Sequence, residues 1–279
     1  MMLSERTKGR RALERGLSYL ILVLTCLVVL FPLAVIVSSS FKTEREIFSF
    51  PMTIIPNEPI LDNFRALLDR FPLYILNSLK VTTLITLIQV LTATSAGYAF
   101  SKLKWRGREF VFLLYISSIM IPFQVYIIPQ FIIVRVLGLY DTHLALILVS
   151  SFTAFGTFLA RQFFLTIPDS YIEAAKISGV NHFQIYRMIM LPLSTPVVAT
   201  LAVLSFRYWW NDLFTALIYI TSQDLKTLPL GLADFVSEYD VYYGPQMAAS
   251  LIAIVPVIII YVFAQRYIVS GVVATGIKG

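Results

Sequence analysis

The chain is organised as long runs of apolar residues separated by short polar segments. One run, from Leu73 to Ser101, is interrupted only by Lys80, and another, Met188–Phe206, continues into Tyr208–Ile220. The remaining runs carry no charge at all: Gly16–Phe41, Phe110–Val134, Thr142–Ala160 and Val241–Gln265. Each run has about the length that a helix needs to cross the hydrocarbon core of a bilayer, roughly 20 residues.

The continuity of these runs decides between the two structures that can span a membrane. Backbone polar groups inside lipid must be satisfied internally, which leaves α-helices or a closed β-barrel. Barrel strands are about 9–11 residues long and alternate in hydrophobicity, whereas these runs are longer and continuous. The sequence therefore predicts an all-α, polytopic membrane bundle of six transmembrane helices.

Composition agrees with a membrane environment. Apolar residues make up 58% of the 279 and charged residues 14%, with a mean hydropathy of +0.79. Soluble domains have roughly 45–50% apolar and about 25% charged residues. The basic start of the chain is compatible with a secretory signal, but the apolar stretch of a cleaved signal is only about 7–15 residues long. We therefore interpret Gly16–Phe41 as a retained span.

The distribution of basic residues predicts the orientation of the bundle. With the N-terminus inside, 14 of the 22 Lys and Arg residues fall on the inner side and 6 on the outer side. The densest group, Lys102 to Arg108, lies in a very short loop, where the excess of inner positive charge is most informative. Both termini are thus expected in the cytoplasm, and the net charge of +6 needs no nucleic-acid partner.

This orientation gives one sizeable inner loop and two outer ones, about 42–72 and 221–240. We divide the chain into a cytoplasmic tail (1–15), a first helix with its outer loop (16–72), a transmembrane domain (73–268) containing the inner loop 166–192, and a C-terminal tail (269–279).

The inner loop predicts two short helices. Ser170 and Glu173 have the spacing of a capping box, and Gly179 is a natural left-handed stop. Asn181 and Gln184 resemble a second cap. A helix of two turns is marginal alone in water, so a partner is expected to pack on it. Its small residues, Ala174, Ala175 and Ser178, and its larger anchors, Tyr171 and Ile172, suit insertion into a groove.

The same loop resembles a known family. Seven positions match the EAA motif of binding-protein-dependent ABC importer permeases at its fixed spacing: Glu173, Ala174, Ala175, Gly179, Ile189, Leu191 and Pro192. Further segments are similar to MalG-type permeases of carbohydrate importers, including Asn77-Ser78-Leu79, Trp210-Asn211-Asp212, Leu228-Pro229-Leu230-Gly231 and the terminal Gly276-Ile277-Lys278-Gly279.

The resemblance implies the type I ABC importer permease fold and a transport function. The EAA loop would form a coupling helix seated in a groove of a separate ATPase dimer, which holds ATP and Mg²⁺, so this chain would need no cofactor. A second permease of the MalF type and an extracytoplasmic substrate-binding protein would complete the importer in a bacterial or archaeal cytoplasmic membrane. The last outer loop, with Leu228, Pro229 and Gly231, would contact the binding protein.

The fifth span carries the candidate translocation path. Arg207, Trp210, Asn211 and Asp212 lie among apolar residues. Ionisable groups at membrane depth are costly and commonly mark pathways or pairs, and aromatic rings beside hydrogen-bonding groups suit a sugar. A structural polar cluster between helices is the alternative interpretation. Arg207 departs from the family pattern, in which a smaller or apolar residue is usual.

Other functions fit the sequence less well. It has one cysteine, two histidines and no Walker A, HExxH or CxxC pattern, so we expect neither a metal site nor catalytic residues. An intramembrane enzyme would need a catalytic pair on facing helices, and Asp212 is the only acid well inside a span. The same importer type acting on another solute, such as a glycerol-phosphate, stays open.

Overall fold

The structure is a computed structural model that describes residues 2–235 and 242–276, with side chains for 14–235, 242–263 and 265. Every regular element in these ranges is a helix, as predicted. Residue contacts divide the chain into two units, one of residues 1–69 with 235–252 and one of residues 70–234 with 253–279. The last helix, α15 (Tyr243–Gly276), runs from the first unit into the second.

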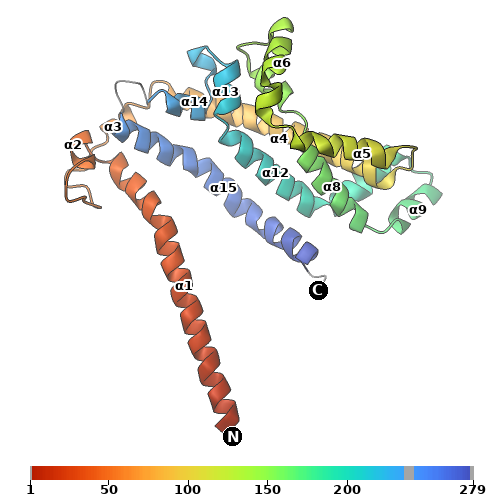
Figure 1. The fold of residues 1–279 in the computed structure, drawn as a ribbon, viewed down its shortest axis with the longest axis horizontal. Helices are drawn as coiled ribbons and strands as arrows, with labels where there is room; N and C mark the ends of the chain where they lie inside the picture. The colour runs from red at the N-terminus through yellow and green to blue at the C-terminus, as the bar shows by residue number, and fades with distance from the viewer. Residues whose placement is uncertain (1, 236–241, 277–279) are drawn as a thin grey trace. The chain divides into compact units, whose positions relative to one another are not determined.

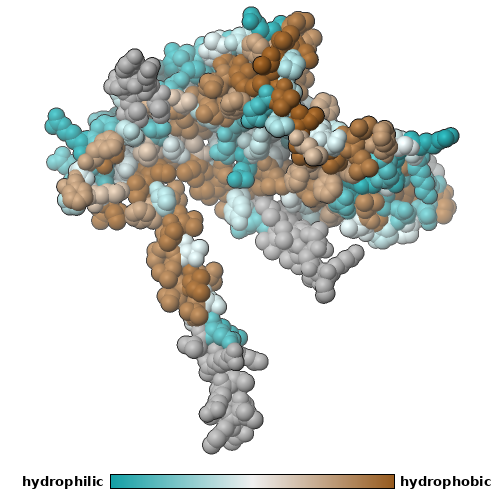
Figure 2. Space-filling view, viewed as in Figure 1, coloured by the Kyte–Doolittle hydropathy of each residue, from teal (hydrophilic) through white to brown (hydrophobic). Residues whose placement is uncertain are grey.

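The first unit contains a long N-terminal helix followed by a compact outer segment. α1 (Met2–Ser40) carries a candidate span, Glu14–Ser40, none of whose most apolar window is buried. Figure 2 shows apolar side chains over this helix, as expected for a surface that faces lipid or another chain. The short helices α2 (Glu44–Ile47) and α3 (Asp62–Arg65) follow α1.

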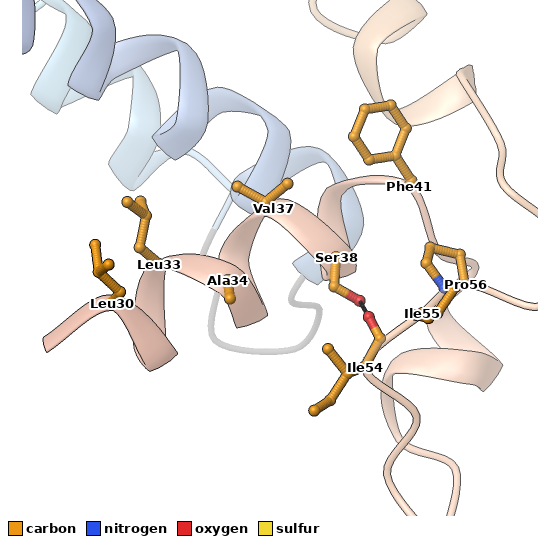
Figure 3. A pocket seen from close by; sticks show the side chains of 9 residues that line it. All are labelled: Leu30, Leu33, Ala34, Val37, Ser38, Phe41, Ile54, Ile55 and Pro56. Atoms are coloured by element: carbon orange, nitrogen blue, oxygen red, sulfur yellow. Dashed lines mark hydrogen bonds between the residues drawn. The ribbon is translucent and has the colours of Figure 1, made fainter. Parts of the chain in front are cut away.

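Hydrogen bonds tie the outer segment to the end of α1. Asn63 donates to the carbonyl oxygens of Ser40 and Lys42 at 3.0 and 2.9 Å, and the buried Lys42 ammonium donates to the Thr53 carbonyl. Ser38 bonds the carbonyl of Ile54 at the edge of an apolar pocket of about 450 Å³ (Figure 3). The outer segment therefore follows the end of α1 as one ordered piece.

The second unit is built around α4 (Phe71–Lys102), a continuous span that packs against α8 (Ala154–Thr166) and α12 (Thr195–Trp210), as Figure 1 shows. Its other helices include α5 (Arg108–Ser117), a 3₁₀ turn (Ser118–Met120), α6 (Phe123–Val136) and α7 (His143–Val149). Later come α13 (Phe214–Tyr219), a 3₁₀ turn (Gln223–Leu225) and α14 (Leu228–Ala233).

Three of the six predicted spans are bent pairs of helices. The axes of Arg108–Met120 and Phe123–Val136 meet at 99°, those of α7 and α8 at 46°, and those of His182–Leu193 and α12 at 80°. Pro122 is the N-cap of α6, and Pro196 lies in the first turn of α12, so two of the three breaks fall beside a proline, which cannot continue the preceding helix. The break between α7 and α8 contains no proline. The fifth apolar run is therefore divided, and its first residues belong to the inner loop.

Candidate functional site

The inner loop folds into the two short helices that its caps predict, although the first helix begins differently. α9 (Ser170–Ile177) has Asp169 as its N-cap, and Ser170 is already helical, so the predicted capping box between Ser170 and Glu173 is wrong. The reason is an ion pair outside the helix. Lys102, at the end of α4, donates to the Asp169 carboxylate at 2.5 Å and to the Ile167 carbonyl at 2.6 Å, which fixes the chain one residue earlier.

The end of α9 agrees with the prediction. Gly179 has a φ of +77°, its N–H donates to the Lys176 carbonyl at 3.0 Å, and the Val180 N–H donates to the Ala175 carbonyl at 3.3 Å. This pair of bonds is the Schellman arrangement that satisfies the last carbonyls of a helix. The stop therefore fixes α9 at eight residues, about two turns.

α9 has one face buried in its own chain. Ile172 and Ala175 are 6% and 8% exposed and join a core cluster with Tyr98 of α4 and Ala160 and Phe164 of α8. Ala175 was predicted to face a partner, together with Ala174 and Ser178, and Ile172 was predicted to anchor in one. The structure corrects both: these two side chains hold α9 to the bundle.

The opposite face of α9 is uncovered. Tyr171 is 50% and Ile177 89% exposed, and Glu173, Ala174 and Ser178 are exposed beside them. Ile177 is a largely exposed apolar side chain that sequence reasoning missed. We call this surface of five residues the docking face.

The second half of the loop returns the chain to the bundle. Asn181 and Gln184 form the predicted capping box at the start of α10 (His182–Ile185), with bonds of 2.9 and 3.0 Å. A π-helical turn (Tyr186–Met190) and α11 (Leu191–Leu193) follow. Ile189 packs partly buried against the core cluster, Leu191 is half-buried, and Pro192 is exposed.

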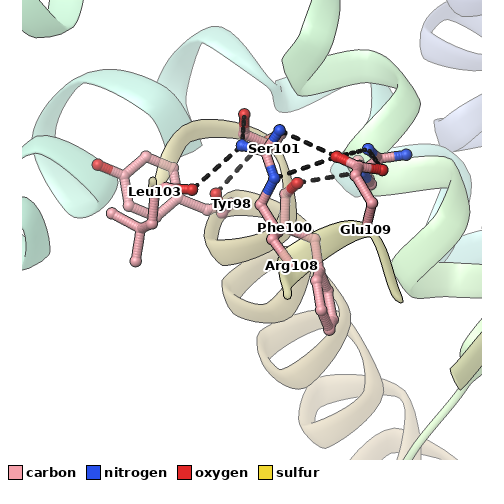
Figure 4. Close-up of polar contacts among 7 residues, drawn as sticks. Tyr98, Phe100, Ser101, Leu103, Arg108 and Glu109 are labelled. Atoms are coloured by element: carbon pink, nitrogen blue, oxygen red, sulfur yellow. Dashed lines mark hydrogen bonds and ion pairs between the residues drawn. The ribbon is translucent and has the colours of Figure 1, made fainter. Parts of the chain in front are cut away.

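A polar cluster braces α4, α5 and α8 near the basic loop that joins α4 to α5, and sequence reasoning did not identify it. The Arg108 guanidinium donates to the carbonyls of Ser101 and Leu103 at 3.2 and 3.1 Å and pairs with Glu109 (Figure 4). Arg161 of α8 pairs with Glu109 at 2.7 Å and donates to the Phe100 carbonyl at 3.1 Å. Part of the basic loop thus holds α4, α5 and α8 together.

The fifth span lines a cavity of about 490 Å³ in the second unit. α12 contributes Arg207, Tyr208 and Trp209, α4 contributes Gln89, and the turn between α7 and α8 contributes Phe152 and Thr153. Of the candidate path residues, the structure places only Arg207 on this wall. Trp209, the residue before Trp210, takes the aromatic position expected for Trp210.

The other three candidate path residues serve the packing of the helix end. Trp210 is 2% exposed, stacks on Phe206 and donates from Nε1 to the Ala253 carbonyl of α15 at 3.0 Å. The Asn211 amide donates to the Arg207 carbonyl at 2.7 Å, which satisfies the end of α12. The Asp212 carboxylate accepts hydrogen bonds from Thr215 and from the Ala216 N–H, at the start of α13.

The last outer segment, up to residue 235, lies against α4. The Leu228 N–H donates to the Ser78 hydroxyl at 2.7 Å, and Asn77 donates to the carbonyls of Asp224 and Lys226 at 2.8 and 3.0 Å. A Cβ on Gly231 would lie 2.2 Å from the Tyr74 ring, so only glycine allows this close approach.

Leu228 and Gly231 are therefore buried and shape the segment from within, while Pro229 is half-buried. The exposed side chains of this last outer segment include Gln223, Asp224 and Asp234. Residues 236–241 of the predicted contact loop lie outside the described residues.

The known proteins that are similar to this chain are transport permeases, and they match it over nearly its whole length. The arabinooligosaccharides transport system permease protein AraQ of Halalkalibacterium halodurans is 34% identical over 90% of this chain and 92% of its own length. The inner membrane ABC transporter permease protein YcjP of Escherichia coli is 34% identical over 97% and 99%.

The fold is also that of a solved importer. One chain of the crystal structure of a bacterial ABC transporter involved in the import of the acidic polysaccharide alginate superposes with a TM-score of 0.81 at 24% identity, covering 90% of this chain and 95% of that one. The bundle is thus a type I ABC importer permease fold. Residues 89–273, which contain the docking face and the cavity, match the family model described as "Binding-protein-dependent transport system inner membrane component". The chain belongs to this family and is a permease subunit of an ABC importer, not an enzyme.

Proposed function

We propose that this chain carries a sugar or oligosaccharide across the cytoplasmic membrane, driven by an ATPase that grips the docking face. Membership of the family implies an ATPase and a substrate-binding protein as partners. The arabinooligosaccharide permeases of H. halodurans and Bacillus subtilis, 34% and 29% identical, support a sugar as the substrate class.

The remaining parts of the assembly follow from this role. A second permease of the MalF type pairs with this one, and each permease docks on one subunit of the ATPase dimer. ATP and Mg²⁺ are held by that dimer, so this chain holds no cofactor. Both termini lie in the cytoplasm, on the same side of the membrane as α9.

The observation that carries the proposal is the division of α9 into two faces. Ile172 and Ala175 fix the helix to the bundle, and the opposite side exposes Ile177 almost fully. Packing on its own bundle stabilises this short helix, yet its other side leaves the apolar surface of Ile177 and Tyr171 uncovered. A groove on a partner that covers the docking face accounts for this uncovered surface.

Substituting the smallest residue of the docking face tests the proposal. Ala174→Trp should abolish co-purification of the ATPase, because the larger side chain prevents close approach of the groove, while the permease still inserts and folds. Ala66→Trp is the matched control, since Ala66 is also exposed but lies on the predicted outer side. An Ala174→Trp complex that retains the ATPase and transports at the normal rate would contradict the assigned role of α9.

A further inference from the structure

Arg207 is a cation in a spanning helix, and among the described residues no carboxylate pairs with it. Its side chain is exposed on the wall of the cavity, three residues before the end of α12. No acidic side chain of the described residues forms an ion pair or hydrogen bond with its guanidinium. The nearest acid along the chain, Asp212, is engaged by Thr215 and Ala216 of the next helix.

An uncompensated guanidinium at this position requires an explanation. Ionisable side chains within spans face a water-filled cavity or the bundle interior and are retained where they meet a counter-charge or a substrate. Arginine also presents several N–H donors in a planar arrangement that matches a carboxylate or phosphate at two points. An anion from outside this chain's described residues would satisfy these donors.

The remaining walls of the cavity indicate what kind of molecule carries that anion. Tyr208, Trp209 and Phe152 provide aromatic surface, and Gln89, Ser205 and Thr153 provide polar groups. The Gln89 amide is held in place, since it donates to the Ser150 carbonyl at 2.6 Å and accepts from the Ser205 hydroxyl at 2.8 Å. Flat apolar faces beside oriented hydrogen-bonding groups match a sugar ring, which has C–H faces and hydroxyl edges.

We propose that this cavity is a cargo site for a carbohydrate that carries an anionic group, a carboxylate or a phosphate, and that Arg207 contacts that anion. The proposal rests on the proposed sugar-import function and specifies the substrate class. The volume of the cavity, about 490 Å³, falls within the range of small-ligand sites, about 300–1,000 Å³. Arg207 then selects between acidic and neutral carbohydrates of the same size.

The first test is a binding screen on the substrate-binding protein that works with this permease. Matched probe pairs distinguish the sources of the anion: digalacturonate against galactobiose for a carboxylate, and glucose-6-phosphate against glucose for a phosphate. One acidic member should bind at least ten-fold more tightly than its neutral counterpart. Preference for the neutral member of both pairs, or binding of none of the four probes, would overturn the proposal.

The second test assigns the selection to Arg207. The intact importer, in proteoliposomes with its binding protein and ATP, should take up the preferred acidic probe. Arg207→Gln should lower the initial rate at least ten-fold, whereas Arg207→Lys, which keeps the charge, should lower it less than three-fold. Arg45→Gln is the matched control, because it removes the same charge from an exposed position in the first unit.

The outcomes separate this proposal from the function on which it rests. Unchanged uptake of the acidic probe by the Arg207→Gln importer would overturn the role of Arg207 while leaving sugar import intact. Loss of assembly of the Arg207→Gln importer would also overturn it, because Arg207 would then pair with an acid of the companion permease. If the wild-type importer takes up none of the four probes and no other carbohydrate in an ATP-dependent manner, the proposed sugar import itself fails.

Discussion

Gly179 stops α9 through its backbone conformation, not through lack of space. Its φ is +77°, yet a Cβ built on it would meet no atom within 4 Å. A side chain at this position therefore costs conformational energy, about 1–2 kcal/mol for most residues, and less for Asn and Asp. The steric cost is small, so substitutions here can separate the backbone requirement from the effect of charge.

Gly179→Asp is expected to block transport while the permease still inserts in the membrane. Asp and Asn both visit the left-handed region, so the matched variant Gly179→Asn imposes a similar backbone strain without a charge. Uptake in proteoliposomes should be retained in large part by the Asn variant and lost by the Asp variant, which places a carboxylate next to the docking face. Equal uptake by the two variants would show that charge at this position has no effect on the ATPase contact.

The Lys102–Asp169 pair gives the docking helix a pH dependence. A hydrogen bond from Lys102, together with its positive charge, lowers the pKa of Asp169 below its ordinary 3.8. A lowered pKa in the folded state means that the stabilisation is complete above pH 3.8 and is lost as the pH falls through the lower, folded value. Hydrogen-exchange protection factors for 170–177 should fall over that acidic range.

The Asp169→Asn variant serves as the control for this titration. It cannot ionise, so its protection of 170–177 should be low already at pH 7 and should not change on acidification. A wild-type helix whose protection does not fall anywhere below pH 3.8 relative to pH 7 would argue against the ion pair as the anchor of the α9 start.

At the scale of elements, the two faces of α9 should respond differently to the same substitution. Ile172→Ala removes a buried side chain from the core cluster and should cost about 2–5 kcal/mol, seen as a lower unfolding temperature. Ile177→Ala alters a side chain that is 89% exposed and should leave that temperature unchanged while weakening ATPase co-purification. A reversal of the two effects would mean that the helix is docked on the opposite face.

The sequence predicted the elements better than their bends. Hydrophobic runs locate the spans because the thickness of the bilayer sets the length of a span and its apolar interior disfavours charged residues. The breaks at Pro122 and Ser194 interrupt the helices without interrupting the apolar composition, so hydropathy alone does not reveal them. Proline marks two of the three breaks, but a proline can also lie inside a continuous helix, as Pro129 does in α6.

At the scale of the molecule, the orientation can be tested by labelling. Cys26 is the only cysteine, so Cys26→Ser gives a background without thiols. In that background, Glu58→Cys should react with a membrane-impermeant maleimide in intact cells, and Lys104→Cys only after permeabilisation. Both positions lie in segments between spans, and the excess of basic residues places the second one inside. The opposite labelling pattern would show that the bundle has the inverse orientation, with α9 on the side of the membrane away from a cytoplasmic ATPase.

The site was predicted in outline and corrected in detail. The EAA spacing located α9 and its glycine stop because local chain geometry depends on residues close in sequence. The start of α9 depends on Lys102, which is 67 positions away from Asp169, and the cavity wall depends on the rotation of α12, which points Trp209 and not Trp210 at the lumen. These features arise from tertiary packing, which overrides a local capping signal.

One buried cluster connects α9 with the cavity. Ile172 and Ala175 of α9 belong to the same continuous core as Ala93 of α4 and Leu201 of α12, and Leu201 also lines the cavity. Close-packed interiors have low compressibility and transmit strain. If the ATPase displaces α9 as proposed, we expect this shared core to transmit the displacement and change the width of the cavity, so that nucleotide turnover and cargo release would depend on one mechanical element.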